Sequence, residues 1–134
     1  MKENILHYLF VFCTKYKKPL LMDSLHPDIL NFTYKYCYEN SMEMVALTIR
    51  DKHTMILEIK TANVADSPQA MIANLKNYVA SELRNKHPFL KTKSPSLWTR
   101  QNFIQTLGTV QADAYEEFIL VQKGVNEWVT IKFY

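Results

Sequence analysis

The chain has little of what marks extended or covalently cross-linked proteins. Its 134 residues include only two glycines, five prolines and two cysteines. So few glycines and prolines argue against long linkers and low-complexity tails. Cys13 and Cys37 belong to no metal-binding spacing and lie in apolar surroundings, so we expect reduced core residues. The length predicts a single domain over residues 1–134.

The sequence also lacks a segment suited to a membrane or to a secretory signal. The apolar run over residues 5–13 carries His7, has no small-residue cleavage site and leads into a basic stretch. It is too short to cross a bilayer, and a buried strand fits it better. We therefore predict a cytoplasmic protein with no membrane partner.

The charge balance is weakly basic, and the cations cluster. The net charge is +3, which permits a nucleic-acid partner without requiring one. One group of lysines follows the first apolar run, and a second group of cations lies between residues 84 and 100. A solvated surface explains such clusters equally well on composition alone.

The first half of the chain predicts a strand, a helix and a hairpin. Residues 5–14 are apolar nearly throughout, as in a central strand. Asp23 or Ser24 can cap a helix that runs to about Asn40. Two alternating runs, joined by a short polar turn, then predict a β-hairpin over residues 43–60. The apolar side chains of these runs are Val45, Leu47 and Ile49, then Met55, Leu57 and Ile59.

The second half predicts a helix, a strand, a further helix and a final β-prone stretch. Asp66 or Ser67 caps a helix that begins with Pro68 and ends before Pro88. Its buried stripe is Ile72, Leu75, Val79 and Leu83. A strand over residues 102–107, a helix over residues 111–122 and a possible last strand within residues 125–134 follow.

This order of elements predicts an α+β fold. It is the ferredoxin-like split β-α-β-β-α-β sheet, with an additional C-terminal helix and a possible last strand. The fold hosts many unrelated activities, so it does not by itself assign a function.

Several segments, in order and at fitting intervals, resemble the small single-tyrosine transposases of the HUH endonuclease superfamily. They are T-K-Y-K-K at residues 14–18, Asp51 at the entry to the second hairpin strand, L-K at residues 75–76 with Ser81, Leu83 and Arg84 after it, L-W-T-R-Q-N-F at residues 97–103, and the helix that ends at Gln122. Together they cover most of residues 8–122. No single segment is specific, but their order strengthens the match.

The resemblance implies an activity on hairpin-ended single-stranded DNA. In such enzymes two histidines and a glutamine hold Mg or Mn, which polarises the scissile phosphate, and a tyrosine attacks it. Members of the family form homodimers by pairing their sheets, so the resemblance implies a homodimer here.

The positions that match the metal ligands are substituted in this chain. The two family histidines fall on Lys52 and Thr54, with His53 between them. A shift by one position pairs His53 with Met55 instead, and neither methionine nor threonine builds a hard-metal site. We therefore expect no metal cofactor, and His53 and Gln122 remain as remnants of the ligand set. The simpler interpretation of His53 is a surface histidine.

The nucleophile position is substituted as well. The family tyrosine falls on Phe118, which has no hydroxyl to form a phosphate ester. Tyr115 lies one helical turn earlier, a shift of about 5 Å, which is large for a positioned nucleophile. The prediction is a catalytically inactive relative.

The leading hypothesis is a transposase-family protein that binds DNA hairpins or single-stranded DNA without cleaving it. The residues expected to bind nucleic acid are Lys15, Lys17, Lys18, Arg84, Lys86, Trp98 and Arg100. A core role is an equal alternative for Trp98 and Phe103. Two other functions stay open: an active transposase that uses Tyr115, and a ferredoxin-like dimeric interaction module without nucleic acid.

Overall fold

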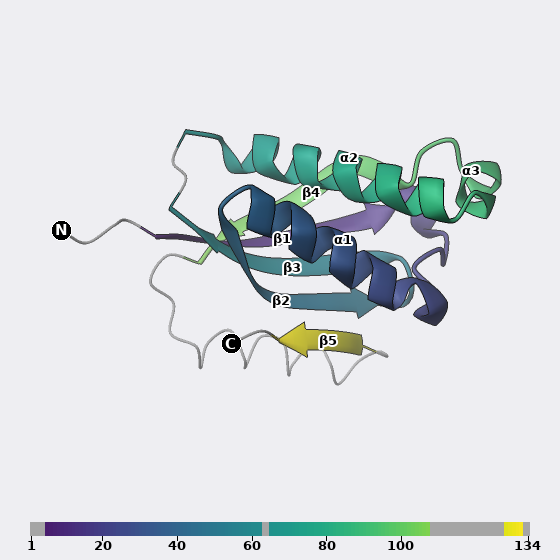
Figure 1. Ribbon diagram of the computed structural model, residues 1–134, viewed down its shortest axis with the longest axis horizontal. Helices are drawn as coiled ribbons and strands as arrows, with labels where there is room; N and C mark the ends of the chain where they lie inside the picture. The colour runs from purple at the N-terminus through teal and green to yellow at the C-terminus, as the bar shows by residue number, and fades with distance from the viewer. Residues whose placement is uncertain (1–4, 63–64, 108–127, 133–134) are drawn as a thin grey trace.

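The computed structural model describes residues 5–62, 65–107 and 128–132, which form one five-stranded sheet with helices on one face (Figure 1). The strand order is β4-β1-β3-β2-β5, and every neighbouring pair is antiparallel. The strands are β1 (Leu6–Thr14), β2 (Met42–Arg50), β3 (Thr54–Thr61), β4 (Trp98–Thr106) and β5 (Trp128–Lys132). The helices are α1 (His26–Glu39), α2 (Pro68–Lys86) and the short α3 (Phe89–Lys93). The predicted α+β class is confirmed.

The apolar first strand takes the interior position that its composition predicts. β1 lies between β4 and β3, with Phe10 opposite Leu57 on one side and Ile104 on the other. β2 and β3 form the expected hairpin, and its turn places Asp51 and Lys52 at φ of 53° and 59°. Two left-handed central residues are the geometry of a type I′ turn, which fits the twist of the paired strands without glycine.

Helices α1 and α2 cover the same face of the sheet, in front of the strands in Figure 1. Ser67 accepts a hydrogen bond from the amide of Ala70 and caps α2 as predicted. The predicted stripe of α2 is fully buried. It packs with Phe10, Leu57 and their neighbours into the main core.

Four sequence-based details were wrong or missing. A β-bulge between Met44 and Ala46 removes Val45 from the core face, so Met42 and Met44 occupy it with Leu47 and Ile49. Neither Asp23 nor Ser24 caps α1, because both belong to a 3₁₀ turn over Asp23–Leu25 that precedes the helix. The N-cap position of α1 is Leu25, whose side chain makes no capping hydrogen bond. The loop after α2 contains α3, and β4 begins at Trp98, four residues earlier than expected.

The other face of the sheet carries a smaller buried cluster, made of Leu9, Ala46, Ile56 and Leu107. None of the helices in the described ranges packs on this face. β5 adds the predicted last strand beside β2. The helix expected over residues 111–122 lies outside the described residues. Within those that are described, no helix has the length and apolar character needed to cross a membrane.

Candidate nucleic-acid interface

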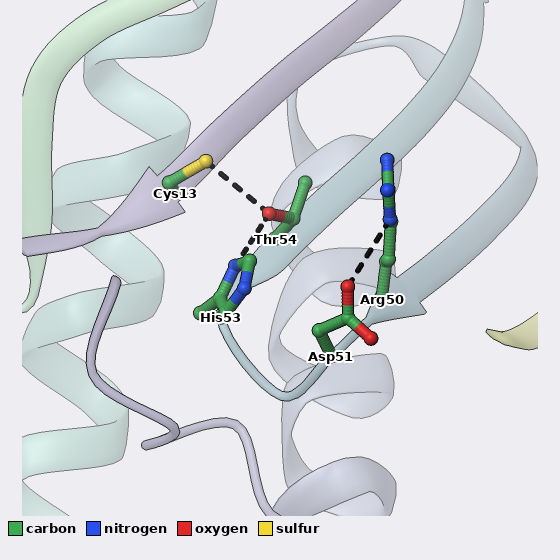
Figure 2. A network of polar contacts seen from close by, with 5 residues as sticks. All are labelled: Cys13, Arg50, Asp51, His53 and Thr54. Carbon is green, nitrogen blue, oxygen red and sulfur yellow. Dashed lines mark hydrogen bonds and ion pairs between the residues drawn. The ribbon is translucent and has the colours of Figure 1, made fainter. Parts of the chain in front are cut away.

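The position expected for the metal lies where the β2–β3 hairpin meets the end of β1. Thr54 is the first residue of β3, and its side chain is buried against Cys13 (Figure 2). The Thr54 hydroxyl shares hydrogen bonds with the Cys13 thiol at 3.3 Å and with Nδ1 of His53 at 2.8 Å. Lys52 lies in the turn, outside the regular strand. Its backbone carbonyl accepts a hydrogen bond from the amide of Leu21.

These donors do not suit a hard divalent ion. A neutral hydroxyl, a thiol and one imidazole that already bonds to Thr54 offer none of the carboxylate or carbonyl oxygens that Mg²⁺ prefers. Across the part of the chain that the structure describes, no three His, Cys, Asp or Glu side chains come close enough to hold a metal ion. Tyr115, Phe118 and Gln122 lie outside the described residues, so their predicted roles stay predictions.

A cleft of about 700 Å³ opens on the helix side of the sheet, between α2, α3 and the first half of β4. We call it the basic cleft. Its cationic lining residues are Lys76, Arg84, Lys91 and Arg100. Of the described residues that line it, none is acidic. The rest of the lining is small or polar on α2, because Ala73, Asn77, Ala80 and Ser81 share the helix face opposite its buried stripe.

Lys76 fixes one wall of the basic cleft. Its ammonium donates to the backbone carbonyl of Thr99 and to Oδ1 of Asn102, both at 2.6 Å. The side chain is buried, and Nζ lies 5.6 Å from the centroid of the Phe12 ring. Desolvation in this position lowers the pKa of Lys76 below its ordinary value. Lys76 therefore ties α2 to β4 and holds the cleft in shape.

Arg84 lies two turns further along α2 and offers donors that the protein does not use. Its Nε is enclosed and makes no hydrogen bond to any described residue. A buried donor without a partner is costly, and such groups call for a ligand, an ion or water. Arg84 also lines the basic cleft, where its positive charge favours a bound anion.

Trp98 supports the floor of the cleft instead of offering a stacking surface. Its ring is buried, its indole N–H donates to the carbonyl of Lys76 at 3.0 Å, and it meets Phe12 edge to face. The core role left open by the sequence describes this position. Phe103 differs, because 55% of it is exposed.

The other predicted cations lie in two further places. Lys15 and Lys17 belong to the turn after β1, where the Lys15 ammonium lies 5.7 Å from the centroid of the Tyr16 ring. Lys18 donates to the backbone carbonyl of Lys93 at 2.6 Å. Lys86 is bound to the carboxylate of Asp28 at 2.7 Å.

The Asp28 carboxylate is therefore shared by two hydrogen-bond partners at the C-terminal end of α2. It accepts from Lys86 and, also at 2.7 Å, from Nε2 of His87. These hydrogen bonds, that of Lys86 first, lower the pKa of Asp28. Lys86 thus joins α1 to α2 and is less available to a ligand than Arg84 or Arg100.

Sequence reasoning missed two residues of the basic cleft, Lys76 and Lys91. In the sequence, Lys76 stood out only as part of the L-K motif. It lies four residues before Ala80 and eight before Arg84, which places all three on one face of α2. Lys91 was one of the clustered cations, and only the short α3 turns it toward the cleft.

A family model matches most of the chain, and solved structures share its fold. Residues 3–122 match the family model described as "Transposase IS200 like". A solved structure of a protein from Deinococcus radiodurans R1, assigned as a transposase, is similar over 91% of this chain and 92% of its own, with 19% identity and a TM-score of 0.69. A REP-associated tyrosine transposase bound to a REP hairpin is similar over 89% of this chain and 64% of its own, with 9% identity and a TM-score of 0.59. The comparison with curated proteins finds no match.

Proposed function

The chain belongs to the family of IS200-like transposases, and from that premise we propose that it binds hairpin or single-stranded DNA without cleaving it. The observation that carries the proposal is the basic cleft, in which four cationic side chains gather with no acidic residue among the described lining. Phosphate contacts from Lys and Arg supply most of the sequence-independent affinity for nucleic acid. Arg84 makes no hydrogen bond through its Nε to the described residues, and its guanidinium supplies one of the positive charges of the cleft.

The hairpin is the first DNA form to test, because one structural neighbour was solved with a REP hairpin. The sequence similarity to that neighbour is only 9%, so the hairpin comes to this chain as part of the proposal.

The absence of cleavage is proposed from the substituted positions. Thr54 and Lys52 stand where the family carries histidines, and the Thr54 hydroxyl already bonds to Cys13 and His53. Phe118 stands where the family carries its nucleophile. A chain without the metal ligands or the phenol lacks both the Lewis acid and the attacking group.

A titration of the protein with a labelled hairpin that carries a single-stranded flank tests both halves of the proposal. The reaction contains Mg²⁺ or Mn²⁺, and each sample is run on a native and on a denaturing gel. We expect a salt-sensitive shift on the native gel and no adduct on the denaturing gel. The absence of any shift with hairpin, single strand or duplex would leave the interaction-module alternative.

Charge-matched variants assign the binding to the basic cleft. Arg84→Gln and Arg100→Gln each remove one cation from the cleft. Lys35→Gln removes one from the exposed surface of α1, where Lys35 pairs only weakly with Glu39 at 4.0 Å. We expect the two cleft variants to weaken binding and the control to leave it unchanged. Equal effects of all three would show that the protein binds DNA through its net charge alone.

The active-enzyme alternative predicts a different result on the denaturing gel. A covalent protein–DNA adduct that disappears in Tyr115→Phe would establish Tyr115 as a nucleophile. The homodimer implied by the resemblance is a separate proposal, which sedimentation analysis with and without DNA tests directly.

A further inference from the structure

A second groove adjoins the basic cleft on the other side of β4. It has a volume of about 600 Å³ and lies between the end of β1, the turn after it and the middle of β4. We call it the stacking groove. Its lining residues are Val11, Phe12, Cys13, Tyr16, Lys17, Thr99, Gln101, Asn102 and Phe103.

Two large aromatic rings of the stacking groove are exposed. Tyr16 is 78% exposed and Phe103 is 55% exposed. They come from separate segments, the turn after β1 and the edge strand β4, and meet at one groove. An exposed pair of aromatic side chains that line a hollow is a surface suited to a flat ligand.

The backbone at Tyr16 is held in an unfavourable conformation. Tyr16 and Lys17 have φ of 59° and 51°, in the left-handed region that bulky residues avoid. The flanking residues fix this turn, because the Lys15 amide donates to the carbonyl of Leu97 at 2.9 Å and the Thr14 hydroxyl donates to the carbonyl of Lys18 at 2.7 Å. The turn therefore presents the Tyr16 ring in a fixed place at the cost of local strain.

The stacking groove and the basic cleft share Thr99 and Asn102 as lining residues. The two hollows thus meet across the first half of β4. Cations accompany both hollows. Lys17 lines the stacking groove and Lys15 lies beside the Tyr16 ring, in addition to the cations of the basic cleft. Of the described residues that line either hollow, none carries a negative charge.

We propose that one DNA strand crosses β4 at Thr99 and Asn102, with phosphates in the basic cleft and unpaired bases stacked on Tyr16 and Phe103. This inference rests on the proposed DNA binding and names the form of DNA that this surface takes. In a duplex the faces of the bases are hidden in the stack, so exposed rings select a single strand or an unpaired flank. Interleaved cations and aromatic rings are the features that single-strand binding surfaces combine.

The test compares an intact oligonucleotide with one of equal length and charge that has abasic residues throughout its centre. With the wild-type protein, we expect the abasic strand and a matched duplex to bind more weakly than the intact strand. Equal binding of the intact and abasic strands would overturn the stacking proposal. If Arg84→Gln still weakened the binding of both strands, the proposed DNA binding would hold and only the stacking of bases would be refuted.

Aromatic variants locate the stacking surface. Tyr16→Ala and Phe103→Ala should each weaken the intact strand roughly 5- to 150-fold, the range measured for the loss of one stacked base, and should leave the abasic strand unchanged. Tyr16→Phe should retain binding, because stacking needs the ring and not the hydroxyl. The control is Tyr38→Ala on α1, which removes a ring that is 75% exposed elsewhere on the surface. A loss with the control that equals the loss with Tyr16→Ala would overturn the assignment.

Discussion

Lys76 offers the sharpest test of how the basic cleft is built. In Lys76→Met the side chain keeps its length and apolar contacts but loses the hydrogen bonds to Thr99 and Asn102. A neutral amine would make the same two bonds, each worth about 0.5–1.5 kcal/mol net. The positive charge adds little, because desolvation lowers the pKa of Lys76 and so disfavours the charged form. We therefore expect Lys76→Met to lower the free energy of unfolding by about 2 kcal/mol.

A truncation separates the hydrogen bonds from the packing of the side chain. Lys76→Ala also removes three buried methylene groups, each worth about 0.8 kcal/mol, so its loss should approach about 4 kcal/mol. Urea titrations of wild type, both variants and Lys35→Met as an exposed control measure these differences. If Lys76→Met were as stable as wild type, desolvation would cancel the hydrogen bonds and Lys76 would not hold α2 to β4.

The pH dependence provides a second check on Lys76. Its pKa in the folded state lies below the 10.5 of the unfolded chain, so the unfolded state binds more protons in the interval between them. Folding stability contributed by this lysine therefore rises as the pH rises through that interval. The stability difference between wild type and Lys76→Met should grow toward pH 10.5, and a constant difference would refute the linkage.

Three further results are expected. In a titration with single-stranded DNA, Arg100→Gln should reduce the slope of log affinity against log salt concentration by about 0.7, the contribution of one phosphate contact. An unchanged slope would show that Arg100 does not contact a phosphate. Asp28→Asn should lower the melting temperature at neutral pH, because a carboxylate with a lowered pKa stabilises the fold while it is ionised. The difference should shrink as the pH falls below 3.8, and a difference that grew in that range would contradict this. A thiol reagent at pH 8 should modify the half-buried Cys13 and leave Cys37 unmodified, since burial raises the pKa of Cys37 to about 12. Modification of both thiols in the native protein would contradict the burial of Cys37.

The framework of the fold was predictable because local signals agreed with the tertiary structure. The spacing of Ile72, Leu75, Val79 and Leu83 defined the buried face of α2, and Ser67 marked its start. Alternation placed Met55, Leu57 and Ile59 in the core. Such signals depend only on residues that are close in sequence, so they can be recognised before the packing partners of each element are known.

The details that sequence reasoning missed depend on contacts between distant segments. The bulge at Val45 is set by the register between β2 and β3, which alternation alone does not reveal. The sequence also did not reveal that Asp28, 58 residues before Lys86, accepts a hydrogen bond from its ammonium. The basic cleft likewise requires α2, α3 and β4 to be placed together.

The proposed binding without cleavage is compatible with the placement of the two regions on opposite faces of the sheet. Thr54 shares the face of Ile56 and Cys13, whereas Lys76 and Asn102 lie on the helix side. The sheet itself separates the two, because Thr54 lies on the face of the smaller cluster and Lys76 packs over Phe12 of the main core. Substitutions that share no partners act almost independently. Substitutions at positions 52 and 54 therefore do not require any change in the basic cleft. On this argument, Lys52→His combined with Thr54→His should leave the loss of DNA affinity caused by Arg84→Gln unaltered. A change in that loss would show that the two faces are coupled.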